Sequence, residues 1–107
     1  MVKVAKDVKK ETEMVKGIHR TIMAYEDQLM LIHFRLEKDA VLPKHSHPHV
    51  QAGYVVSGKL EFWEGDLTYI LEEGDSYVCP ANVPHGAKVL DDAIVIDSFV
   101  PKRDDYL

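Results

Sequence analysis

His45-Ser46-His47-Pro48-His49-Val50-Gln51 is the most informative stretch of this sequence, because it carries three of the chain's six histidines. Proline lacks a backbone donor and disfavours helix at the residue before it, so Pro43 and Pro48 favour extended backbone for His45 and His47. Side chains at i and i+2 of extended backbone leave from the same face. Two imidazoles on one face can bind a single divalent metal ion, and imidazole nitrogen suits several such ions.

A third ligand from the same stretch is either Gln51 or His49. Gln51 has the same parity as His47 and offers a carboxamide oxygen. A regular strand would send His49 to that face as well, so the bend at Pro48 decides between the two, and parity leaves both open. A His-x-His pair alone is common on exposed strands, so the metal site needs support from elsewhere in the chain.

The composition predicts one small domain with a small-molecule partner. The chain has 107 residues, of which 46% are apolar and 29% charged, an ordinary globular balance. We expect a single domain over residues 1–107, with a core at about 18–100, a short N-terminal strand or arm at 1–17 and a tail at 101–107. The net charge is −5 and the basic residues are scattered, which argues against a nucleic-acid partner or an anionic membrane surface.

Cysteine usage and hydropathy predict a cytoplasmic location. The only cysteine, Cys79, excludes an internal disulfide and a cysteine-based metal cluster, and it fits a reducing compartment. Cys79 lies in an apolar run, where a core position is expected rather than a nucleophile. No apolar run has the length of a membrane span, and the first residues lack the apolar core of a signal peptide.

Alternating hydrophobicity predicts strands at 18–25 and 29–36, joined by a turn at 26–28. In the second strand, alternate residues from Met30 to Leu36 are expected to face a hydrophobic layer. His33 and Arg35 share the opposite face, which is either solvent or the wall of a cavity; Arg35 is then a candidate second cation for an acidic ligand.

Turn chemistry divides the rest of the chain into short strands. Val2-Lys3-Val4 suggests an edge strand, Ser57-Gly58 a hairpin, and Asp91-Asp92 a break between strands at 87–90 and 93–100. Further turns are expected at 65–66 and 72–75. About eight short strands without a long helix predict an all-β antiparallel sandwich or barrel, with a small-molecule site in its interior.

Taken together, the spacings resemble the two motifs of the cupin superfamily. The first is His45-x-His47 with Gln51 and then Gly58, and the second is Gly74, Pro80 and His85. The resemblance implies a cupin-type antiparallel β-barrel, the double-stranded β-helix or jelly roll, which holds one divalent metal ion: Ni, Zn, Mn, Fe or Co. The metal ligands that it implies are His45, His47, Gln51 and His85. Many cupins have Glu at the position of Gln51 and Gly at the position of Asn82.

A narrower resemblance is to the small cupins of the pectin-degradation protein KdgF type. It is carried by 45–55, 74–77, 80–86 and 97–106, and it covers nearly the whole chain from about residue 18. An amide at Gln51 is expected in this family. The resemblance implies that 4,5-unsaturated monouronates, small acidic sugars from pectin and alginate breakdown, are converted to linear keto forms by ring opening and enol–keto tautomerisation. It also implies functional roles for Asp97, Phe99 and Arg103.

Two other functional classes share these features: a non-catalytic cupin that binds a small molecule or metal, and a metal-dependent dioxygenase. Asp97 also has a structural alternative, because it can satisfy a loop amide. Since one short sandwich leaves apolar strand faces uncovered, and small cupins commonly pair through their sheets, we also expect a homodimer.

Overall fold

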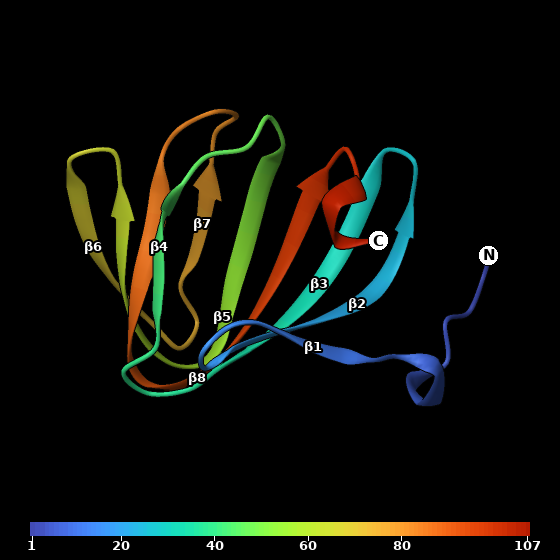
Figure 1. The fold of residues 1–107 in the computed structure, drawn as a ribbon, viewed down its shortest axis with the longest axis horizontal. Helices are drawn as coiled ribbons and strands as arrows, with labels where there is room; N and C mark the ends of the chain where they lie inside the picture. Colours follow the sequence, from blue (N-terminus) through green and yellow to red (C-terminus); the bar gives the residue numbers. More distant parts are fainter.

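A computed structural model describes all residues 1–107, and it consists of eight strands and two single 3-10 turns. All strand pairs are antiparallel, in the order β1-β2-β3-β8-β5-β6, with β4 on β8 and β7 on β5. Figure 1 shows the strands curved around a common interior, with β1 and the N-terminal segment extending to one side. The predicted all-β antiparallel barrel is confirmed. The elements are η1 (Lys6–Val8), β1 (Glu11–Val15), β2 (Ile18–Glu26), β3 (Leu29–Leu36), β4 (Val41–His45), β5 (Val50–Glu64), β6 (Leu67–Glu72), β7 (Ser76–Cys79), β8 (His85–Val100) and η2 (Asp104–Tyr106).

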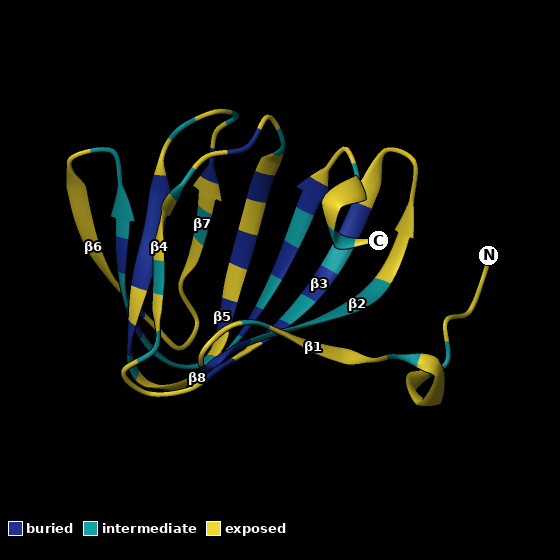
Figure 2. Ribbon diagram, in the orientation of Figure 1, coloured by how far each residue is buried: buried dark blue, intermediate teal, exposed yellow.

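The inner faces of the strands form one hydrophobic core of 15 buried residues. The predicted strands at 18–25 and 29–36 are present, and Met30 and Ile32 are fully buried, as their parity predicts. Alternate buried and exposed bands along β5 show the same period of two (Figure 2). His33 and Arg35 lie on the outer face of β3, where Arg35 is paired with Glu11, so Arg35 is not a second cation for an interior ligand.

The two longest strands, β5 and β8, each run through a position where the sequence predicts a break. The Ser57-Gly58 hairpin is absent, and β5 instead carries irregular register against β8 on both sides of Gly58, opposite Asp91 and Asp92. Gly58 has a φ of 90°, and a Cβ there would collide with the Asp92 carbonyl oxygen and with Ala93. Glycine therefore permits a bulge and a close strand approach here, so that β5 and β8 bend together without ending.

The N-terminal strand is not where Val2-Lys3-Val4 predicts it. Val2 and Val4 are exposed and outside any strand, whereas β1 spans the more polar Glu11–Val15. Apolar residues do not predict the position of this strand, because β1 is held by its ladder to β2 and by the Glu11–Arg35 ion pair. Of the β1 residues, only Met14 packs on the core. Neither of the two helical turns is long and apolar enough to cross a membrane.

The C-terminal tail folds back onto the barrel. Arg103 is buried, and the Tyr106 ring in η2 packs against the Phe99 ring with centroids 6.0 Å apart. The tail therefore brings side chains from beyond the last strand to the barrel interior.

Candidate metal centre and its acidic neighbour

Three histidines from two neighbouring segments meet inside the barrel. His45 ends β4, His47 lies in the loop that follows, and His85 begins β8, directly across the ladder from His45. One ring nitrogen from each lies within 4.8 Å of the others. The sequence predicts that His45 and His47 share a face, and the β4–β8 pairing adds His85 to them.

Backbone carbonyls fix which nitrogen each ring offers. The Nδ1 atoms of His45, His47 and His85 lie 3.0, 3.0 and 2.9 Å from the carbonyl oxygens of Pro43, His49 and Val83. A carbonyl is only an acceptor, so each Nδ1 carries the proton and each Nε2 keeps a free lone pair. Burial, aided by the charge of Arg103, lowers the pKa of His47 to about 4, and burial also lowers the pKa of His85. Both imidazoles are therefore neutral near pH 7.

Gln51 lies beside this cluster with its oxygen turned toward the histidines. Its Nε2 donates to Asp97 Oδ2 at 2.8 Å, which leaves Oε1 3.1 Å from His47 Nε2. Since the His47 proton is on Nδ1, the contact joins two lone pairs, and this arrangement is favourable with a cation between them. The donor set of imidazole nitrogens and one amide oxygen therefore fits a divalent ion.

His49, the alternative to Gln51, lies outside this group. Its ring centroid is 5.5 Å from that of His47, and it is absent from the group of convergent ligand atoms. Its buried Nδ1 has no hydrogen-bond partner. Of the two open candidates, Gln51 is the one whose ligand atom faces a histidine Nε2.

Asp97, on β8, is the buried acid behind Gln51. Only 3% exposed, it accepts hydrogen bonds from Gln51 and from the Tyr77 hydroxyl, the latter at 2.6 Å. Burial raises the pKa of Asp97 to about 7, and the two hydrogen bonds oppose a larger rise. Asp97 is thus a carboxyl group with two donors, and its pKa is near neutrality.

Sequence reasoning missed Tyr77, although two signals point to it. Tyr77 shares strand parity with buried Cys79 in β7 and lies opposite Gly53 of β5. A Cβ on Gly53 would overlap both Asp97 and Tyr77, so this glycine leaves room for the acid–phenol contact. A glycine inside a strand is the signature of such a close approach. Cys79 itself is fully buried, and burial raises its pKa to about 12, consistent with a core thiol.

Phe99 and Arg103 complete the wall of the inner cavity. The Phe99 ring lies 5.7 Å from the His47 ring, and the Arg103 guanidinium lies 5.2 Å from the Phe99 centroid. Arg103 also donates to both carboxylate oxygens of Asp105, at 3.2 and 2.8 Å. Asp97, Phe99 and Arg103 therefore line the same cavity as His45, Gln51 and His85.

This fold and this cluster define a class of protein, and the comparisons agree with it. The profile of the cupin domain matches residues 32–99, and the chain belongs to the cupin family. Within that family it is similar to the pectin degradation protein KdgF of Dickeya dadantii, with 36% identity over 97 residues, which is 89% of this chain and 88% of that protein.

Two solved structures agree over nearly the whole chain. KdgF from Halomonas sp. superposes with a TM-score of 0.91 at 35% identity, covering 100% of this chain and 99% of that one. An RmlC-like cupin from Shewanella frigidimarina superposes with a TM-score of 0.92 at 28% identity, covering 98% and 95%.

Proposed function

We propose that this protein is a metal-dependent cupin that converts 4,5-unsaturated monouronates to linear keto forms by ring opening and enol–keto tautomerisation. The observation that carries the proposal is the Gln51 amide, whose oxygen faces His47 of the three-histidine cluster and whose nitrogen donates to a buried acid. It joins a candidate metal centre to a candidate proton carrier. The similarity to KdgF over most of the chain supports the substrate class.

The residues that would hold the ion are His45, His47, Gln51 and His85. Their free Nε2 lone pairs and the amide oxygen are already aimed inward, so little reorganisation is needed for binding. A divalent ion would act as a Lewis acid, stabilising negative charge on substrate oxygens. The ligand set suits Ni, Zn, Mn, Fe and Co alike.

The substrate needs one proton removed and one delivered. Its ring oxygen is attached to a carbon–carbon double bond beside the carboxylate, so the ring oxygen is that of an enol ether. Loss of the proton of the anomeric hydroxyl forms a carbonyl and breaks the bond from the anomeric carbon to the ring oxygen, which leaves as an enolate. A proton delivered to the far carbon of the double bond gives the ketone, so the reaction is an isomerisation without oxidant or reductant.

Asp97 is our candidate for both proton transfers. A carboxyl group whose pKa is near 7 is partly ionised at neutral pH and can act first as base and then as acid. Its hydrogen bonds to Gln51 and Tyr77 fix its position. Arg103 would bind the substrate carboxylate through the guanidinium edge that Asp105 leaves free, and Phe99 would exclude water.

The test is the decay of the unsaturated chromophore near neutral pH, with and without protein, since the sugar also opens spontaneously. Asp97→Asn should slow turnover by about a hundredfold or more, the scale of a general acid or base. Asn can still accept from Gln51 and can donate to Tyr77, so metal content should stay at the parent level. Asp66→Asn, at the exposed position of the 65–66 turn, is the matched control and should be as fast as the parent.

Other outcomes would favour the other functional classes. No acceleration by the parent, with saturable binding of the sugar, would indicate a binding module. A rate that disappears without oxygen would indicate a dioxygenase. An Asp97→Asn variant as fast as the parent would remove Asp97 from the mechanism.

A homodimer and a cytoplasmic location stay part of the proposal. The outer faces of β5, β7 and β8 expose Val50, Tyr54, Val56, Val78 and Val100, each at least 40% exposed, which a second copy could cover. Sedimentation should give twice the chain mass of 12.2 kDa, and a monomer mass at micromolar concentration would contradict the dimer. The location is supported by the single free cysteine, Cys79.

A further inference from the structure

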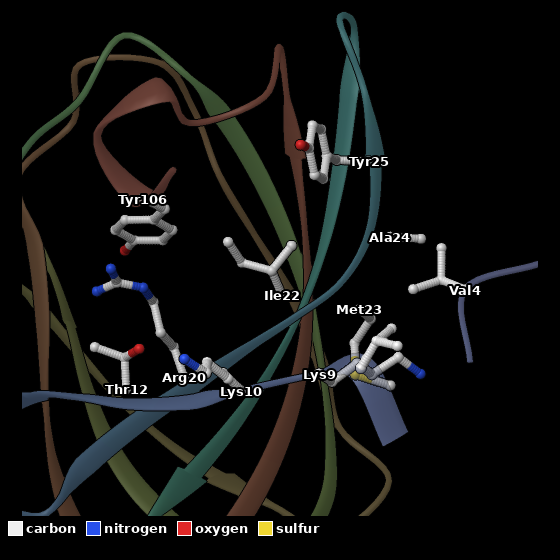
Figure 3. A pocket seen from close by; sticks show the side chains of 11 residues that line it. Val4, Lys9, Lys10, Thr12, Arg20, Ile22, Met23, Ala24, Tyr25 and Tyr106 are labelled. Carbon is white, nitrogen blue, oxygen red and sulfur yellow. The ribbon is translucent and has the colours of Figure 1, made fainter. Parts of the chain in front are cut away.

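A second cavity, of about 310 Å³, lies outside the candidate metal centre. It is bounded by the N-terminal segment, by β2 and by Tyr106 of η2. Figure 3 shows Arg20 and Tyr106 on one side of it, Val4 and Tyr25 on the other, and Ile22 between them. Its volume is in the range of small-molecule pockets and is large enough for a monosaccharide.

The charged residues of this outer pocket are all cations. Lys9, Lys10 and Arg20 line it, and no Asp or Glu does, although the chain as a whole carries a net charge of −5. None of the three forms an ion pair. By contrast, each of the other two arginines is paired with a carboxylate, Arg35 with Glu11 and Arg103 with Asp105. Arg20 is thus the one arginine of the chain without a carboxylate partner.

Arg20 points to the inside of the barrel. It lies between Ile18 and Ile22 on the core-facing side of β2, across the ladder from Phe34. Its guanidinium is half-buried and stacks on the Tyr106 ring, 4.2 Å from the centroid. A planar guanidinium in this position keeps free N–H donors for a carboxylate while its flat face is held by the aromatic ring.

Tyr106 connects the outer pocket to the candidate site. It lines both cavities, its ring packs on Phe99 at 6.0 Å, and Phe99 in turn packs on His47 at 5.7 Å. The Arg103 guanidinium also lies over the Tyr106 ring, at 4.1 Å. Two aromatic rings therefore separate Arg20 from the histidines, so a sugar held by Arg20 is adjacent to the reacting position and not in it.

We propose that the outer pocket is an anion subsite that captures uronates before they enter the inner cavity. Arg20 binds the carboxylate, Lys9 and Lys10 add positive potential, and the Thr12 and Tyr106 hydroxyls face the sugar hydroxyls. Ile22 and Met23 offer the apolar surface on which a sugar ring packs. That the anion is the substrate of the inner site rests on the proposed function, whereas carboxylate binding by the pocket does not.

The experiment uses D-galacturonate, which is saturated and so cannot undergo the proposed reaction. The chain has three arginines, so the side-chain Nε–H region of a ¹⁵N–¹H NMR spectrum of the protein as purified holds three signals. Galacturonate should shift the Arg20 signal saturably and leave the Arg35 signal unmoved, and neutral D-galactose should shift neither. Galacturonate should shift the backbone amide signals of Lys10 and Thr12 in the parent and in the control Lys88→Gln, which removes an exposed positive charge from β8, and should not shift them in Arg20→Gln.

Kinetics on the unsaturated uronate separate capture from chemistry. Arg20→Gln should raise KM about tenfold, the scale of one hydrogen bond to a charged group, with kcat within about twofold of the parent. Lys88→Gln should change neither constant. An Arg20 signal that does not shift with galacturonate would overturn the subsite. A lower kcat at unchanged KM in Arg20→Gln would also overturn it. If the parent accelerates no ring opening while the Arg20 signal still responds, the proposed function fails and the anion subsite stands.

Discussion

Replacing Gln51 by Glu tests the link between the candidate metal centre and the candidate proton carrier. The change keeps the shape of the side chain and exchanges its amide nitrogen for an oxygen. That nitrogen donates to Asp97 Oδ2 at 2.8 Å, so the variant brings two carboxyl groups into contact in a buried site. Two unit negative charges at this distance repel by about 6 kcal/mol at an effective dielectric constant of about 20.

The pair is therefore expected to keep one proton at neutral pH. A repulsion of about 6 kcal/mol corresponds to about 4 pKa units between the two ionisation steps, which belong to the pair and not to either residue. The pKa of Asp97 is already raised to about 7 by burial, so the second proton leaves the variant well above pH 7. Asp97 is then no longer a free base, and turnover should fall by about a hundredfold or more although a carboxylate ligand binds metal at least as well.

The sign of the pH dependence follows from linkage. A carboxyl group whose folded pKa exceeds its unfolded value stabilises the fold when protonated, and this contribution is lost as pH rises through the folded pKa. In the metal-free parent the Asp97 contribution is lost between about pH 4 and pH 7. In metal-free Gln51→Glu the loss should continue between pH 7 and pH 9, where urea unfolding would detect it. Parental turnover, or stability that is flat from pH 7 to pH 9, would refute the contact on which this reasoning rests.

Two further predictions concern the metal and the strand bends. His47→Ala and His85→Ala should each abolish stoichiometric metal in the purified protein, whereas His49→Ala should retain it; full metal content in the first two variants would contradict the ligand assignment, and loss in the third would favour His49 over Gln51. Gly58→Ala should destabilise the fold by about 2–4 kcal/mol in urea unfolding, because positive φ and a collision with β8 act together. Gly74 has a φ of 93° and open space around it, so Gly74→Ala should lower the free energy of unfolding only through backbone strain, by about 1 kcal/mol. Equal losses of stability in the two variants would show that the close approach of β8 to Gly58 is unimportant.

The sequence predicts those parts of the fold that depend on local periodicity and misses those that depend on pairing. Burial of alternate residues in β3 follows from a period of two. Ser57-Gly58 has hairpin chemistry, yet its conformation is set by β8, because the ladder partner of Ser57 is Ile94, 37 residues further along the chain. A bulge in β5 accommodates this pairing. Local turn chemistry cannot distinguish a hairpin from a bulge that a distant strand imposes.

In the candidate site, too, the sequence predicts what depends on local spacing and misses what depends on strand pairing. Motif spacing indicates the three histidines, but the direction of the Gln51 amide depends on Asp97, 46 residues away. Arg35 and Arg20 lie on neighbouring strands, and parity within one strand leaves open which face is inside. The register resolves this, because Arg20 lies opposite buried Phe34. Of these two arginines, Arg20 is therefore the one that faces inward, although the sequence of its strand contains no recognisable motif.

In the proposed mechanism, a neutral ligand at position 51 would explain how an anionic sugar and a carboxyl base can share one cavity. If the acid were itself a ligand, its charge would be neutralised by the ion and its lone pairs would be occupied, so it would be a poor proton carrier. Here Asp97 lies one hydrogen bond behind the ligand atom, where Gln51 and Tyr77 hold it. In the proposed mechanism the ion would keep its charge for the substrate, and Arg103, whose guanidinium lies over Phe99, would donate to the substrate from the edge that Asp105 leaves free. The separation of ligand from base is thus the physical reason to expect proton transfer at this centre, and it is the separation that Gln51→Glu would remove.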